Sequence, residues 1–167
     1  KAKERTKGII GVNIMVALTN FSDMVKTSVK EQADVIFSGA GLPLDLPSYL
    51  SEEDKTKLVP IVSSARATKI ICEKWTNKYN YVPDAIVVEG PKAGGHLGYK
   101  LNQINDKEFS LEMNLPHILE EVDSWRQKFG KEIPVIAAGG IYTGGDMHKF
   151  MDMGADGVQM ATRFVTT

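Results

Sequence analysis

The chain has 167 residues, of which 43% are hydrophobic and 25% are charged, the make-up of one globular domain with a sizeable core. Its formal net charge of -1 provides no broad basic surface, which argues against binding to nucleic acid or to an acidic membrane. Because the single cysteine, Cys72, excludes an internal disulfide and no run approaches the roughly 18 apolar residues of a membrane span, we expect a soluble, cytoplasmic protein.

Short, nearly continuous apolar runs recur along the chain and predict strands that are buried on both faces. Most of these runs are separated by segments with helical spacing, so a parallel sheet with helical cover is expected. Pro60 removes one backbone donor and is expected near the start of its strand or at a bulge. The predicted strands lie within residues 8–16, 34–38, 58–62, 83–88, 134–138 and 154–160.

Helices are predicted between these strands. Asn20 is expected to cap the first of them, and Ser51 with Asp54 predicts a short acidic helix over residues 51–55. Further helices are predicted over residues 65–79 and 114–129, with a short one that ends at Met153. This alternation excludes a β-sandwich and leaves an open doubly wound sheet or a (β/α)8 (TIM) barrel.

The last two strand ends favour the barrel. A dinucleotide-binding sheet would need Gly-x-Gly-x-x-Gly soon after its first strand, and residues 8–15 lack it. Residues 137–140 and 158–163 instead look like the loops after strands seven and eight of a TIM barrel, whose backbone amides hold a phosphate. The chain is then a single domain, residues 1–167, that covers strands three to eight and is incomplete at its N-terminus and its C-terminus.

A glycine-rich loop after the strand at 83–88 carries His96. Glycines tolerate positive φ and let the backbone approach a ligand closely. About twenty residues separate Glu89 from the next clear helix, and connections of that length are often lids or binding loops. A surface turn with a solvated histidine is the alternative interpretation. His117 and His148 fall in predicted helices and are expected to be solvated or packed.

Four motifs then stand out in order, at residues 11–15, 89–98, 136–141 and 154–164. Together they resemble the nitronate monooxygenase family, formerly called 2-nitropropane dioxygenases, over essentially the whole chain. The same motifs and spacing are similar to those of the flavin-dependent enoyl-acyl-carrier-protein reductases. The family's opening strands are absent, and Pro91-Lys92 stands where the family more often has small or acidic residues. These departures leave the substrate open.

The resemblance implies an enzyme that oxidises alkyl nitronates or nitroalkanes with O2 and binds FMN with its phosphate at the barrel mouth. His96 is then the catalytic residue, because an imidazole with a pKa of about 6.5 takes or gives a proton near neutral pH. On matching positions the resemblance makes Gly139, Gly140, Ala161 and Thr162 donors to the phosphate. It also assigns Asn13 and Ser63 to the isoalloxazine or ribityl region, and Gly94, Gly95 and Gln159 to the cofactor site.

The resemblance also allows an FMN-dependent enoyl-acyl-carrier-protein reductase, in which NAD(P)H supplies hydride and the enoyl thioester occupies the same cleft. A third interpretation is a barrel segment that only binds a phosphate ligand. The expected partners are therefore small molecules, with no metal, nucleic acid or membrane, and a homodimer is left open as the assembly state.

Overall fold

Six parallel strands form one sheet and stand in sequence order. In the computed structural model, which describes residues 2–167, neighbouring strands pair in the order β1-β2-β3-β4-β5-β6. The absence of any reversal of strand order in residues 2–167 is typical of consecutive barrel strands and differs from a doubly wound sheet. The predicted α/β fold is confirmed as a half-barrel. The strands are β1 (Gly11–Met15), β2 (Val35–Gly39), β3 (Lys57–Val62), β4 (Ile86–Glu89), β5 (Val135–Ala138) and β6 (Gly157–Gln159).

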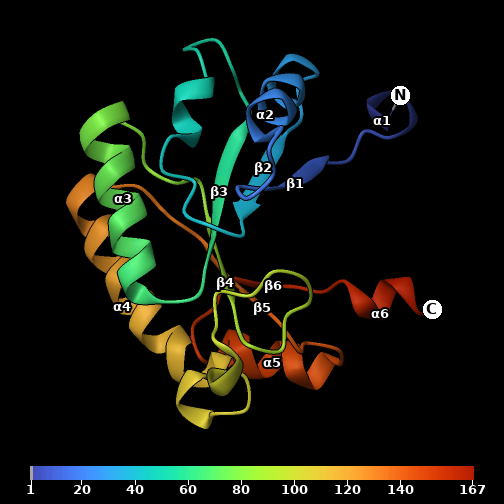
Figure 1. The fold of residues 1–167 in the computed structure, drawn as a ribbon, viewed down its shortest axis with the longest axis vertical. Helices are drawn as coiled ribbons and strands as arrows, with labels where there is room; N and C mark the ends of the chain where they lie inside the picture. The colour runs from blue at the N-terminus through green and yellow to red at the C-terminus, as the bar shows by residue number, and fades with distance from the viewer. Residues whose placement is uncertain (1) are drawn as a thin grey trace.

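Helices connect most of the strands, and α3 and α4 lie side by side against the sheet (Figure 1). Between β2 and β3 the connection contains only a short 3-10 helix. Within residues 2–167 no helix is long and apolar enough to cross a membrane. The helices are α1 (Ala2–Arg5), α2 (Phe21–Lys30), η1 (Leu46–Tyr49), α3 (Ala65–Tyr79), η2 (Leu101–Gln103), η3 (Lys107–Phe109), α4 (Leu111–Phe129), α5 (Gly144–Asp152) and α6 (Thr162–Val165).

Capping side chains account for the bounds of the long helices. The Ser64 hydroxyl accepts a hydrogen bond from the Ala67 amide at the start of α3. Helix α4 begins at Leu111, three residues before the predicted start, because the hydroxyl of Ser110 accepts from the Met113 amide. Asn20 precedes α2, but its side chain makes no capping hydrogen bond, so that part of the prediction is wrong.

Two further local predictions are wrong for identifiable reasons. Residues 51–55 form a turn and not a helix, because the Asp54 carboxylate accepts from both the amide and the hydroxyl of Ser51 and β3 begins at Lys57. Pro60 lies inside β3. It is tolerated there because β3 pairs with β2 up to Pro60 and with β4 from Ile61 onward.

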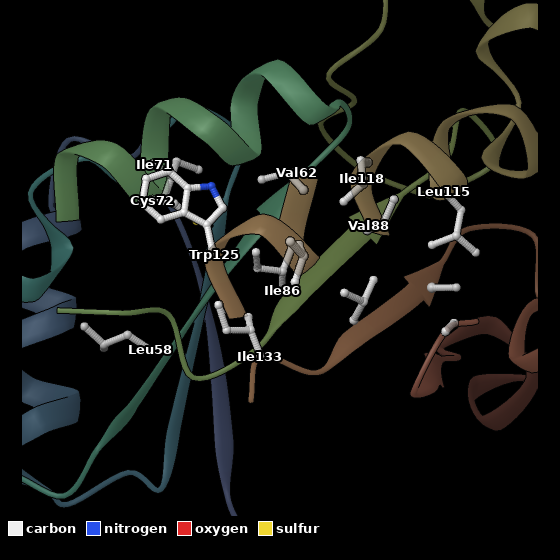
Figure 2. Packing of buried hydrophobic residues seen from close by; sticks show 14 of the residues in the cluster. Leu58, Val62, Ile71, Cys72, Ile86, Val88, Leu115, Ile118, Trp125 and Ile133 are labelled. Carbon is white, nitrogen blue, oxygen red and sulfur yellow. The ribbon is translucent and has the colours of Figure 1, made fainter. Parts of the chain in front are cut away.

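Alternate side chains of each strand point to opposite faces and form two apolar clusters. The larger cluster packs between the sheet and the helices, where Trp125 of α4 lies against Ile71 and Cys72 of α3 (Figure 2). The smaller cluster covers the concave face of the sheet. Its members are Val59, Ile61, Ala85, Val87 and Ala138, with Val35, Phe37 and Ile136 packed against them.

Aspartates at the amino-terminal edge of the sheet bind the first amides of neighbouring strands. Oδ2 of Asp34, just before β2, accepts from the Ile10 amide at 2.8 Å. Asp84 precedes β4 and accepts from Leu58 at 3.0 Å, and Asp156 precedes β6 and accepts from Val135 at 2.8 Å. Each even-numbered strand is thereby tied to the strand before it, which opposes slippage of the register.

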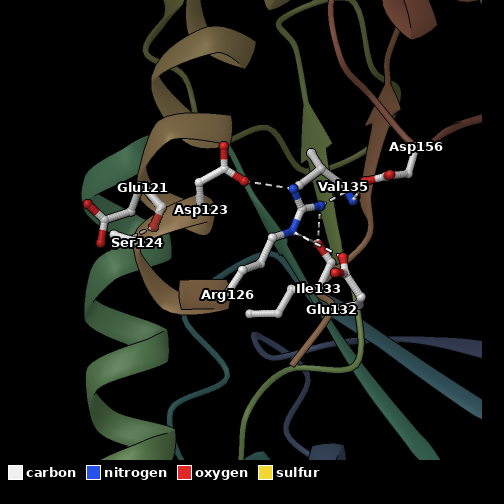
Figure 3. Close-up of polar contacts among 8 residues, drawn as sticks. All are labelled: Glu121, Asp123, Ser124, Arg126, Glu132, Ile133, Val135 and Asp156. Atoms are coloured by element: carbon white, nitrogen blue, oxygen red, sulfur yellow. Dashed lines mark hydrogen bonds and ion pairs between the residues drawn. The ribbon is translucent and has the colours of Figure 1, made fainter. Parts of the chain in front are cut away.

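Arg126 joins two of these features at the end of α4 (Figure 3). Its guanidinium donates to the Ile133 carbonyl at 2.7 Å and contacts Asp123 at 2.8 Å and Asp156 at 2.9 Å. Because Asp156 also accepts from the Val135 amide, the Arg126 side chain links α4 with the segments that lead into β5 and β6.

Asp84 has the most heavily bonded carboxylate of the three. It accepts hydrogen bonds from the Tyr81 hydroxyl and the Leu58 amide, and it pairs with Lys57 and Lys131 at 3.3 and 3.2 Å. Burial alone raises the pKa of this carboxyl, but the hydrogen bonds and the Lys131 charge outweigh burial and hold the pKa below its usual value.

Asp84→Asn is expected to lower the free energy of unfolding by about 2 kcal/mol at neutral pH, because it removes these charge-assisted contacts. Because the pKa of Asp84 is depressed in the folded protein, its stabilising contribution is complete above about pH 4. This contribution is lost as the pH falls through the pKa of Asp84 in the folded state. Denaturant unfolding at about pH 7 and about pH 2.5 measures the change, and the difference between wild type and variant should shrink in acid.

Asp152→Asn, at an exposed position of α5, is the control and should change stability by less than about 0.5 kcal/mol. If the difference in free energy of unfolding between wild type and Asp84→Asn is the same at both pH values, the depressed pKa of Asp84 is contradicted.

Candidate functional site

The carboxyl ends of the parallel strands meet at one edge of the sheet, where barrel enzymes place their active sites. A cavity of about 210 Å³ lies there between the ends of β2, β3 and β4 and the loop that follows β4. Ser63 and His96, both predicted as site residues, line it together. The other lining residues are Ala40, Gly41, Leu42, Ile61, Val62, Ala67, Glu89, Leu97 and Gly98.

Contacts at Tyr99 and Gly98 hold the loop that carries His96. The Tyr99 hydroxyl donates to the Glu89 carbonyl at 2.9 Å and lies 3.4 Å from the Ser63 carbonyl. A Cβ on Gly98 would lie 2.3 Å from Oγ of Ser63, so a larger residue at this position would displace that hydroxyl. Burial raises the pKa of Tyr99 and keeps it a donor. The loop is therefore pinned next to Ser63.

The tip of this loop is open. A Cβ on Gly94 or Gly95 would have no atom within 4 Å, and Gly95 has φ of +81°, a conformation that favours glycine. His96 itself is exposed and makes no hydrogen bond within residues 2–167. The backbone at the tip and the imidazole are thus accessible to a ligand.

The loop after β4 also packs on the turn after β5. Gly139 and Gly140 have φ of +102° and +75°, and added Cβ atoms would lie 2.9 Å from the Ala93 amide nitrogen and 2.9 Å from Cβ of Lys92, respectively. Two positive φ values and two close approaches explain this glycine pair. The predicted phosphate turn therefore lies directly beside the His96 loop.

Unused backbone donors gather at the ends of β5 and β6. Within residues 2–167, the amides of Gly139, Gly140, Ala161 and Thr162 donate no hydrogen bond. The two ends are adjacent, since β5 pairs with β6 up to Gln159. Free amides at adjacent strand ends suit a phosphate group, so the residues present fit the phosphate of the cofactor that the motifs imply.

Tyr142 connects the same two ends. Its ring lies 5.0 Å from the Arg163 guanidinium carbon, and its hydroxyl lies 3.5 Å from Oγ1 of Thr166 in the last segment. At the start of α5, Thr143 and Asp146 use their amides in reciprocal capping bonds, whereas the amides of Gly144 and Gly145 donate no hydrogen bond within residues 2–167. The first turn of α5 therefore adds free donors beside those of the strand ends.

Asn13 and Gln159 occupy separate positions. Their neighbours Val12, Ile14 and Val158 pack on the helix side, so both side chains lie on the concave face. They belong to β1 and β6, the two outermost strands, and neither lines the cavity of His96. The structure thus brings Ser63 and His96 together, places the four residues predicted to bind phosphate at the adjacent ends of β5 and β6, and leaves Asn13 and Gln159 outside the cavity of His96.

Two polar residues of this edge were missed in the sequence. Tyr99 pins the loop, and Glu89 is a half-buried carboxyl on the cavity wall whose pKa is raised by burial. The only sequence signal was that Glu89 directly ends an apolar strand. His117 and His148 are exposed on helices as expected, and burial raises the pKa of the Cys72 thiol to about 12, which makes this thiol unreactive.

A sequence model of the nitronate monooxygenase family matches residues 1–167. A probable nitronate monooxygenase of Staphylococcus aureus is 32% identical over 148 residues, which are 88% of this chain and 37% of the relative. An indene-carboxyl-CoA dehydrogenase of Mycobacterium tuberculosis is 29% identical over 167 residues, 100% of this chain and 41% of the relative. The chain spans about two fifths of the length of these curated relatives.

Solved structures agree with the half-barrel. FabK from Thermotoga maritima superposes with a TM-score of 0.74 at 30% identity, covering 99% of this chain and 45% of that one. A nitroalkane oxidase from Streptomyces ansochromogenes gives a TM-score of 0.74 at 18% identity, covering 98% of this chain and 52% of that one, which supports the fold alone.

Tyr99→Phe is expected to loosen the His96 loop, because the Glu89 carbonyl loses its donor at a cost of about 1 kcal/mol. Amide hydrogen exchange over residues 94–105 should become about fivefold faster. Tyr142→Phe removes a hydroxyl from a different loop and serves as the control, since it should leave exchange in this segment unchanged. Equal exchange in Tyr99→Phe and wild type would rule out the pinning role.

Proposed function

Because the chain belongs to the nitronate monooxygenase family, we propose that the protein is an FMN-dependent oxidoreductase that oxidises alkyl nitronates or nitroalkanes with O2. The observation that carries the proposal is that one edge of the sheet combines the cavity of Ser63 and His96 with the free amides at the ends of β5 and β6. A proton-handling residue next to an anion site is what a reaction on a nitro compound beside FMN requires.

His96 would act as the base on a nitroalkane. Its imidazole lines the cavity and has no hydrogen-bond partner within residues 2–167, so it is free to take the proton from the carbon that bears the nitro group. The Ser63 hydroxyl, in the same cavity, would donate to a nitro oxygen. Preformed nitronates need no such proton removal, and for them His96 would act as a hydrogen-bond donor.

FMN would be held from both sides of the barrel mouth. The amides of Gly139, Gly140, Ala161 and Thr162 would receive its phosphate. The side chains of Asn13, Ser63 and Gln159 and the open backbone at Gly94 and Gly95 would contact the rest of the molecule. When bound, FMN supplies the electron acceptor and the transfer of electrons to O2.

A second candidate is an enoyl-thioester reductase that uses NAD(P)H. The likeness to FabK, a flavin-dependent enoyl-acyl-carrier-protein reductase, favours it, as does a relative that acts on a CoA compound. A hollow of about 550 Å³ between the His96 loop and the start of α4 would offer room for a long substrate, with Pro91, Ile104 and Met113 on its apolar side.

His96→Ala is expected to retain bound FMN but to lower kcat/KM for neutral nitroalkanes by about a hundredfold or more, the range for loss of a general base. Preformed nitronates should be affected less. O2 consumption measures both rates, and FMN absorbance measures cofactor content. His148→Ala, which removes an exposed histidine of α5, is the matched control and should behave as wild type.

Parallel assays of full-length protein separate the two candidates. The oxidase is supported if the protein consumes O2 with propyl-2-nitronate and does not oxidise NAD(P)H in the presence of crotonyl thioesters. The reverse pattern would replace it with the reductase, and a purified protein that binds no FMN would refute both.

A further inference from the structure

Glu89 places a carboxyl group in the space where the substrate of His96 would lie. It is the last residue of β4, and its neighbour Val88 packs on the helix side, so the Glu89 side chain lies on the concave face. Its backbone carbonyl accepts the 2.9 Å hydrogen bond from Tyr99, which fixes the start of the side chain. The side chain itself lines the cavity together with Ser63 and His96.

The carboxyl group has no structural task in the fold. It has no hydrogen-bond or ion-pair partner within residues 2–167, whereas Asp84, Asp34 and Asp156 each bind a strand amide. Half-buried carboxyl groups that only stabilise a fold are paired in this way, because an unpaired one costs free energy. An unpaired carboxyl in a cavity is therefore available to a ligand.

The surroundings favour the neutral form of Glu89. Leu42, Ile61, Val62 and Ala67 supply apolar walls, and no lysine or arginine lines the cavity. The titratable groups near it are His96 on the wall and Tyr99 beneath it. Burial raises the pKa of Glu89, and a protonated carboxyl can donate a hydrogen bond.

Building on the proposed function, we propose that Glu89 is a third substrate-contacting residue beside His96 and Ser63, whose carboxyl group donates a hydrogen bond to an oxygen of the nitro or nitronate group. His96 handles the proton on carbon, and no bond is made or broken at Glu89. A nitronate carries its negative charge on the two oxygens, so neutral Glu89 attracts it and ionised Glu89 repels it. Glu89 thereby makes the binding of anionic substrates depend on pH.

Nitrate is a suitable probe, because it is a planar anion with its charge on oxygen, as a nitronate is. Calorimetric titration of FMN-loaded full-length protein from about pH 4 to about pH 8 should show nitrate affinity falling as Glu89 ionises. Glu89→Gln keeps a donor and removes the charge. It should bind nitrate as wild type does at the acid end and about tenfold more tightly at the alkaline end.

Two further variants complete the design. Glu89→Met, of similar length but with neither donor nor charge, should bind nitrate weakly at the acid end, where wild type binds well. Glu108→Gln removes an exposed carboxylate from the same connection and should follow the wild-type curve. His96 is present in every one of these proteins, so the ratio of nitrate affinity between variant and wild type isolates the contribution of Glu89.

The outcomes separate the two proposals. Parallel pH curves for wild type and Glu89→Gln, in a wild type that oxidises propyl-2-nitronate, would overturn the role of Glu89 alone. An FMN-loaded wild type with neither nitrate binding nor nitronate turnover would overturn the proposed function and this inference together. We expect the ratio of Glu89→Gln to wild type to rise with pH for nitrate affinity, and to rise equally for kcat/KM with the nitronate.

Discussion

The hydrogen bonds that the carboxylates of Asp34, Asp84 and Asp156 accept from amides at the beginnings of neighbouring strands are the interactions on which the rest of the structure depends. Side chains alternate between the two faces of a strand, so a slip of one residue would exchange every inward position for an outward one. Such a slip in β4 would turn Glu89 toward the helices and Val88 toward the cavity. The register held at one edge of the sheet thus decides the chemistry at the other.

The two edges of the sheet are built differently. At the amino-terminal edge, charged side chains are paired with amides and with one another, as in the group around Arg126 and in the contacts of Asp84 with Lys57 and Lys131. At the carboxyl-terminal edge, the amides that follow β5 and β6 and the carboxyl of Glu89 have no partner within residues 2–167. Paired groups stabilise the fold, whereas unpaired ones are free to bind a ligand, which agrees with the placement of active sites in barrels.

Glycines bring the separate loops of this edge together. Gly98 lies against Ser63, and Gly139 and Gly140 lie against the segment at Lys92 and Ala93, each so closely that an added Cβ would force a neighbouring atom to move. The His96 loop is therefore packed between the ends of β3 and β5. This packing explains how the cavity of His96 and the free amides at the end of β5 come to lie next to each other, although their residues are far apart in the sequence.

The sequence by itself determined the six strands, the long helices, the half-barrel and the positions of Ser63, His96 and the Gly139-Gly140 turn, because apolar periodicity and glycine placement are local signals. The catalytic role of His96 and the roles of Asn13, Ser63, Gly94, Gly95, Gly139, Gly140, Gln159, Ala161 and Thr162 in cofactor binding stay predictions. Only the tertiary structure decided that residues 51–55 form a turn, that Asp84 holds Leu58, and that Glu89 and Tyr99 belong to the site of His96. Those outcomes depend on which strands are neighbours and on how deeply a group is buried, and neither can be read from spacing along one chain.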